Sequence, residues 1–143
     1  MKHNLILRVV SKFLIPLIIL FGLYVQFHGD FGPGGGFQAG VIVASAIILY
    51  GLVYGLDVAE KIIPANVLRL LAGFGVILYA GVGVFTLIFG GNYLEYGVLA
   101  STQVGGQHLG ILLVELGVGI TVSSVMLIIY FAFAGRGREE ETQ

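Results

Sequence analysis

Four long apolar runs, separated by short polar or glycine-rich segments, dominate the pattern along this chain of 143 residues. A helix that crosses the bilayer core needs about 20 mostly apolar residues, and each run reaches that length. The pattern predicts an all-α integral membrane protein with four transmembrane helices, at about residues 5–27, 37–57, 67–89 and 108–133.

One four-helix membrane domain is expected over residues 1–134, with no second domain and no convincing internal repeat. Pro64 lies in the middle connection, where it is expected to stop a helix. The last residues, 135–143, read GRGREEETQ and are expected to form a polar, frayed tail.

Composition agrees with the membrane class. Hydrophobic residues make up 57% of the chain and charged residues only 10%, whereas a soluble domain carries about 25% charged residues. The net charge of −1 and the lack of a basic stripe argue against nucleic-acid binding. The absence of cysteine excludes disulfides, iron–sulfur ligation and thiol chemistry within this chain.

The positive charges predict the orientation. The first and third connections, residues 29–36 and 90–107, contain no Lys or Arg. Cations accumulate on the cytoplasmic side of membrane proteins, so both termini and the middle connection are expected in the cytoplasm. The cations in question are Lys2, Arg8, Lys12, Lys61, Arg69, Arg136 and Arg138.

The first connection contains an unusual segment, HGDFGPGGGFQAG, at residues 28–40. It is no P-loop, because no Gly-Lys-Ser/Thr follows the glycines. It also lacks the spacing of a dinucleotide fingerprint, and no strand precedes it. His28 and Asp30 are types of residue that ligate metals, but two ligands do not make a site. No metal and no cofactor is expected.

Six glycines exceed what a tight connection needs, so the segment is expected to approach another backbone closely, on a neighbouring helix or a partner subunit. Phe31 and Phe37 are expected to anchor it at the membrane interface. The structural or docking motif comprises His28, Gly29, Asp30, Phe31, Gly32, Pro33, Gly34, Gly35, Gly36, Phe37, Gln38 and Gly40.

Glu115 lies about two turns into the fourth run, where a carboxylate costs roughly 2.5–3.5 kcal/mol to insert. It is therefore expected to be a proton or cation relay or an interhelical ion-pair partner. The alternative is a purely structural role, in which a protonated Glu115 donates a hydrogen bond to a neighbouring backbone carbonyl. His108, seven residues earlier on nearly the same helical face, is a second relay candidate. Asp57, at a helix end, is a candidate for collecting cytoplasmic cations.

Two stretches, FHGDFGPGGGFQAGVI and GQHLGILLVELGVGITVSSVM, resemble the MnhB family, which supplies one subunit of the Mrp-type multisubunit Na+/H+ antiporter. The resemblance covers nearly the whole chain. It implies an accessory subunit of a hetero-oligomer in the prokaryotic cell membrane that exchanges cytoplasmic Na+, or sometimes Li+ or K+, for external H+. Its expected partners are the other subunits of that complex and membrane lipid.

Other classes of function are weighed beside this one. Related subunits occur in redox-driven pumps akin to membrane-bound hydrogenase and complex I, and this is the main alternative. A small autonomous channel is a third class. An enzyme is not expected, because no nucleophile, base and orienting group occur together. Glycines inside the runs indicate close helix packing, within one bundle or against helices of other chains.

Overall fold

The computed structural model describes residues 5–29 and 32–141. Four of its helices are long and apolar enough to cross a membrane, which confirms the predicted all-α class and the four spans. The elements are α1 (Leu5–His28), α2 (Gly36–Tyr54), α3 (Leu56–Ile62), α4 (Ala65–Ile88), the 3-10 helix η1 (Tyr96–Leu99) and α5 (Gln103–Glu141).

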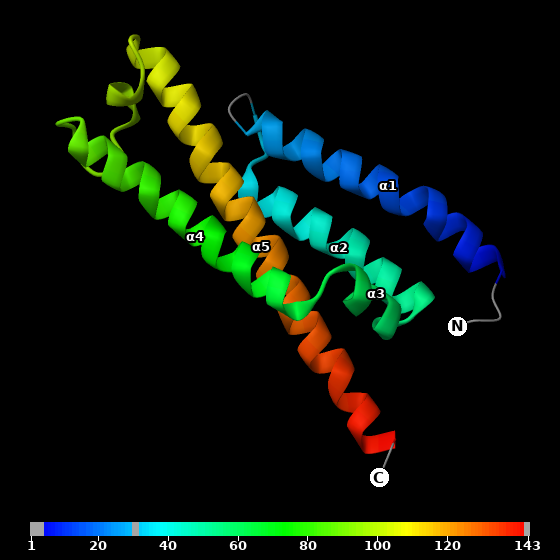
Figure 1. Ribbon diagram of the computed structural model, residues 1–143. Coiled ribbons are helices and arrows are strands. Elements are labelled where there is room, and N and C mark those ends of the chain that lie inside the picture. The colour runs from blue at the N-terminus through cyan, green and yellow to red at the C-terminus, as the bar shows by residue number, and fades with distance from the viewer. Residues whose placement is uncertain (1–4, 30–31, 142–143) are drawn as a thin grey trace.

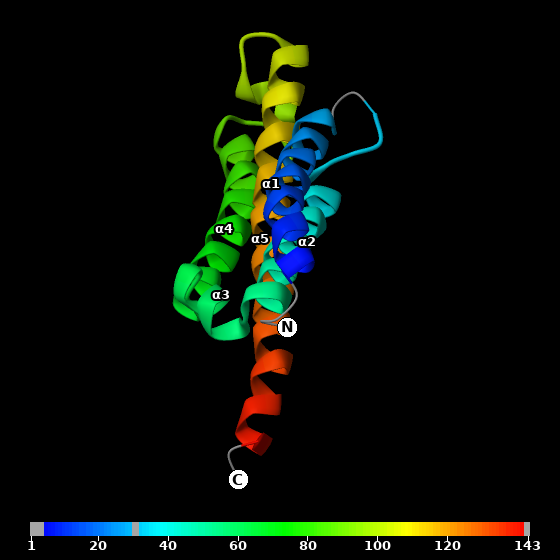
Figure 2. The same ribbon diagram turned by 90° about the vertical axis from the view of Figure 1, so that its right-hand side faces the viewer.

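The long helices form an open row rather than a closed bundle. Helix α5 packs between α4 on one side and α2 on the other, and α1 packs mainly on α2 (Figures 1 and 2). As a result, only 11% of the residues in the most apolar stretch of α1 are buried within the chain, against 39% in that of α2. Most of the apolar surface of α1 therefore faces lipid or other chains.

Backbone constraints set the helix ends near the middle connection. The second span was expected to reach residue 57, but α2 ends at Tyr54 because Gly55 adopts φ 108°. That conformation is open mainly to glycine. A short helix, α3, fills most of the middle connection. Pro64 precedes α4, and its carbonyl accepts hydrogen bonds from the N–H groups of Val67 and Leu68.

Helix α5 is longer than the fourth apolar run. It begins at Gln103 rather than 108 and continues to Glu141, so residues 135–141 of the expected frayed tail are helical. At about 1.5 Å per residue, the 39 residues span about 58 Å, nearly twice a 30 Å hydrocarbon core. The C-terminal turns project beyond the other helices (Figure 1).

The connection between α1 and α2 lies beside α5 partway along its length, below the end of α5 that stands highest in Figure 1. Two contacts made by α5 show where along the helices this connection lies. On α5, Gly117 packs against the backbone of Gly75 and Tyr79, in the middle of α4. Two residues before it, Glu115 packs against the α1–α2 connection. Irregular backbone at membrane depth requires protein or water around it, and α5 supplies protein on one side.

The ends of the row are fixed by different contacts. A buried cluster of Ala44, Ala59, Leu68, Leu127 and Phe131 joins α2, α3, α4 and α5 at the end that carries the chain termini. At the opposite end, the N–H of Leu94 donates to the hydroxyl of buried Thr86. Burial raises the pKa of Tyr96 in the connection between α4 and α5, and Tyr79 and Tyr93 raise it further.

Candidate functional site

The carboxyl group of Glu115 lies against two glycines of the α1–α2 connection. A Cβ atom placed on Gly29 would overlap both carboxyl oxygens, and one placed on Gly35 would lie 2.9 Å from Oε1. Real Cβ atoms do not approach other atoms this closely, so neither position has room for a side chain while Glu115 keeps its conformation. The side chain of Glu115 is half-buried in this arrangement.

Gly36 makes the closest backbone approach in the site. A Cβ on this residue would overlap the carbonyl oxygen of Glu115 and lie 3.0 Å from its Cα. One turn further along α2, a Cβ on Gly40 would lie 2.7 Å from the carbonyl oxygen of Gly119. The two glycines therefore let α2 and α5 pack backbone to backbone, as small residues do in membrane helices.

The remaining glycines close the connection over the end of α1. The N–H of Gly32 donates to the carbonyl of His28 at 3.2 Å, and that of Gly35 donates to Val25 at 3.2 Å. Gly35 has φ 114°, which side chains rarely allow. A Cβ on Gly34 would lie 2.8 Å from the carbonyl oxygen of Val25. The glycines thus allow the chain to turn at the end of α1, permit the positive φ of Gly35 and leave room for Glu115.

The site also joins two helix ends of opposite polarity. Helix α1 ends at His28, and α2 begins at Gly36 after the N-cap residue Gly35, which has no side chain to cap the helix. The N-terminus of a helix carries a partial positive charge and favours a nearby anion by about 0.3–1 kcal/mol. Glu115 lies beside Gly35 and Gly36, at this N-terminal end of α2.

Gln26 forms the next polar layer and was missed by the sequence analysis. It lies one turn before Gly29 on α1 and is only 6% exposed. Its Oε1 atom lies 2.5 Å from a Cβ placed on Gly119, one turn after Glu115 on α5. The sequence signal that could have identified Gln26 is its position as a polar residue three places before Gly29.

The other candidate residues, His28, His108 and Asp57, lie at three different places in the structure. His28 is half-buried and its ring stacks on Tyr24 with centroids 5.2 Å apart. His108 lies on α5 about two turns before Glu115 and is exposed, whereas Asp57 lies in the first turn of α3. Helix α3, which carries Asp57, lies toward the end that carries the termini (Figure 1).

Within the glycine segment, the predicted members differ in exposure. Gly32, Pro33, Phe37 and Gln38 are exposed, and Phe37 reaches 60%. Asp30 and Phe31 lie outside the described residues, so their predicted roles have no structural account. Among the residues that are described, no three His, Cys, Asp or Glu side chains gather into a group that would hold a metal ion.

Known proteins resemble the chain over most of its length. Residues 6–128 match the family described as "Domain related to MnhB subunit of Na+/H+ antiporter". A subunit of the Na(+)/H(+) antiporter of Bacillus subtilis is 32% identical over 130 residues, which cover 84% of this chain and 90% of that protein. The putative antiporter subunit mnhB2 of Staphylococcus haemolyticus is 33% identical over 139 residues, covering 94% and 98%. The mnhB2 protein of Staphylococcus aureus strain Newman is 32% identical with the same coverage.

Proposed function

Since the chain belongs to the family of the MnhB subunit of Na+/H+ antiporters, we propose that Glu115 and the glycines around it form a proton or cation relay within such a complex. The single observation that carries this role is the packing of the Glu115 carboxyl group against Gly29 and Gly35, with Gly36 against the backbone of Glu115.

The chain is an accessory, multi-pass membrane subunit of a multisubunit Na+/H+ antiporter, so its partners are other subunits and the transported ions. The family and the relatives are antiporter subunits and lend no support to the redox-pump alternative. The same names describe a transporter component rather than an enzyme.

A carboxyl group within a membrane helix is rare and costly, and such groups mark proton and ion pathways. Glu115 is half-buried and packs against the glycine segment, so we propose that it takes up and releases a proton there. An assembly role, in which Glu115 pairs with a partner subunit, remains the competing proposal, and the test in the Discussion separates the two.

His108 is the proposed neighbour of Glu115 on the outer side. The two residues are seven positions apart on one helix, which corresponds to about 10 Å along the axis. Exposed His108 stands nearer the outer connection, beyond the level of the glycine segment. Asp57, near the opposite end, is proposed to attract cations in the cytoplasm.

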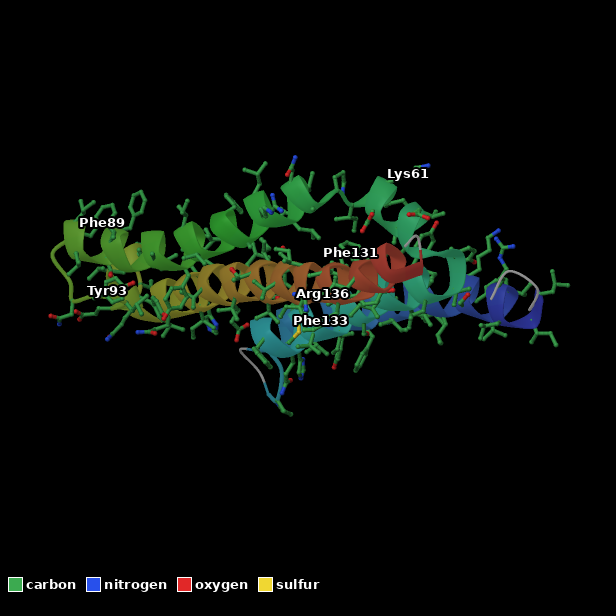
Figure 3. The ribbon with its side chains drawn as sticks, turned by 90° about the horizontal axis from the view of Figure 1, so that it is seen from below. Lys61, Phe89, Tyr93, Phe131, Phe133 and Arg136 are labelled. Atoms are coloured by element: carbon green, nitrogen blue, oxygen red, sulfur yellow. The ribbon has the colours of Figure 1, made fainter. Side chains whose placement is uncertain are left out.

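The proposed orientation places both termini in the cytoplasm. Several observations support it: the termini and α3 lie toward one end of the row (Figure 1), and Lys61 lies far from Phe89 and Tyr93 (Figure 3). The cation-free connections lie at the other end.

Labelling of single cysteines tests this orientation, because the natural chain has none. In intact cells, a membrane-impermeant maleimide is expected to label Asn92→Cys but not Lys61→Cys. In inverted vesicles the pattern is expected to reverse. The opposite pattern in both preparations would contradict the proposed orientation.

Removal of the chain tests the function itself. We expect membranes that lack this subunit to lose Na+-dependent dissipation of ΔpH and to regain it when the gene is restored. The purified chain alone in liposomes is expected to move no ions, because its sequence has a single carboxylate well inside the apolar runs. Ion flux through the isolated chain would favour the autonomous channel, and unchanged exchange without the chain would refute its role.

A further inference from the structure

A groove runs between α1, α2 and α5, directly inward of the Glu115 layer. Its volume is about 180 Å³ and it is partly open to the surroundings of the row. Most of the groove is apolar or glycine, and its polar side chains are those of Gln26 and Ser123. The other residues of the groove are Gly22, Leu23, Ala39, Gly40, Val43, Leu116, Gly119 and Ile120.

Gln26 contributes an unsatisfied hydrogen-bonding group to this groove. The side chain is 6% exposed, and its Nε2 atom has no hydrogen-bond partner among the described residues. A buried amide N–H group without a partner is costly where water is scarce.

Neither water nor a lipid tail would both fill the groove and give Gln26 a hydrogen-bond partner. A volume of about 180 Å³ corresponds to about six waters at roughly 30 Å³ each, and a buried water makes about three hydrogen bonds. Two polar side chains cannot supply that many, and the Ser123 hydroxyl already donates to the Ile120 carbonyl at 3.1 Å. A lipid tail fills the volume but offers no acceptor to Gln26.

We infer that a transmembrane helix of another subunit of the antiporter packs on this groove, inserts side chains into it and presents a hydrogen-bond acceptor to Gln26. Such a helix fills the apolar volume and satisfies the amide at once. The open row of helices leaves that face available, and α1 has few neighbours within the chain. The inference rests on the chain being an antiporter subunit and does not depend on the role of Glu115.

Photo-crosslinking in the complete complex tests which molecule occupies the groove. Leu23 on α1 and Leu116 on α5 line the groove and are 47% and 37% exposed. A photoreactive residue at either position is expected to crosslink to the same antiporter subunit, identified by mass spectrometry. Crosslinks only to lipid, only to a second copy of this chain, or to no molecule would overturn the inference.

A second variant tests the amide itself. Gln26→Met keeps the length of the side chain and removes its hydrogen bonding, so retention of the crosslinked subunit during purification is expected to fall about three- to tenfold. Gln38→Met is the matched control, because Gln38 lies outside the groove and is exposed. Unchanged retention with Gln26→Met, or an equal loss with Gln38→Met, would contradict the assignment. Should Gln26→Met fail to fold, the crosslinks decide.

Discussion

Glu115→Gln is expected to lower Na+-dependent dissipation of ΔpH in inverted vesicles by about tenfold or more, since a group that transfers protons contributes factors of this size or larger. The amide has nearly the same shape as the acid. It therefore fits between Gly29 and Gly35, where the carboxyl oxygens now lie. It cannot exchange a proton near neutral pH, so the packing is kept and the relay is lost.

The amount of assembled complex separates the two proposed roles of Glu115. Normal assembly with lost exchange supports the relay. Lost assembly supports an ion pair with a partner subunit, and normal exchange with normal assembly refutes both. Glu95→Gln is the matched control, because Glu95 lies in the connection between α4 and α5 and accepts a hydrogen bond from the N–H of Asn92. An amide oxygen can still accept that bond, so no loss of exchange is expected.

Gly36→Ala is expected to destabilise the chain by about 1–3 kcal/mol or more, the usual range for overpacking. Its Cβ would meet the backbone of Glu115 rather than a flexible side chain. Backbone atoms cannot rotate away, so α2 and α5 must move apart. We expect a lower apparent melting temperature and less chain in the purified complex.

Gly73→Ala provides the control for this substitution. Gly73 lies within α4, and a Cβ there would meet no atom within 4 Å. Alanine replaces glycine in a helix with a gain of about 0.5–1 kcal/mol, so the melting temperature of the chain should stay equal or rise. If both variants were equally stable, the close approach of α2 to α5 at Glu115 would be wrong.

The sequence was sufficient to predict the four spans and to mark the glycine segment as a place of close approach. It left open whether the neighbour was a helix of the same chain or of a partner. The contacts of Gly29, Gly35 and Gly36 with Glu115 identify a helix of the same chain. That pairing joins residues about eighty positions apart, and hydropathy carries no information about which helices become neighbours.

The sequence did not predict where α2 and α5 end, and it did not draw attention to Gln26. Gly55 interrupts α2 because of its positive φ, which is a local backbone state rather than a matter of hydrophobicity. The polar residues after Gly135 still continue α5, because a helix already formed extends easily into water. Gln26 was missed because a single amide in an apolar run barely changes the hydropathy, although its burial makes it conspicuous in the structure.

The most direct test of a proton relay at Glu115 is infrared difference spectroscopy of the purified complex. Adding Na+ is expected to change the intensity of a protonated-carboxyl C=O band in the natural complex, and Glu115→Gln is expected to remove that change. An identical Na+-induced band in both complexes would show that Glu115 does not exchange its proton, and the account of the site would be contradicted.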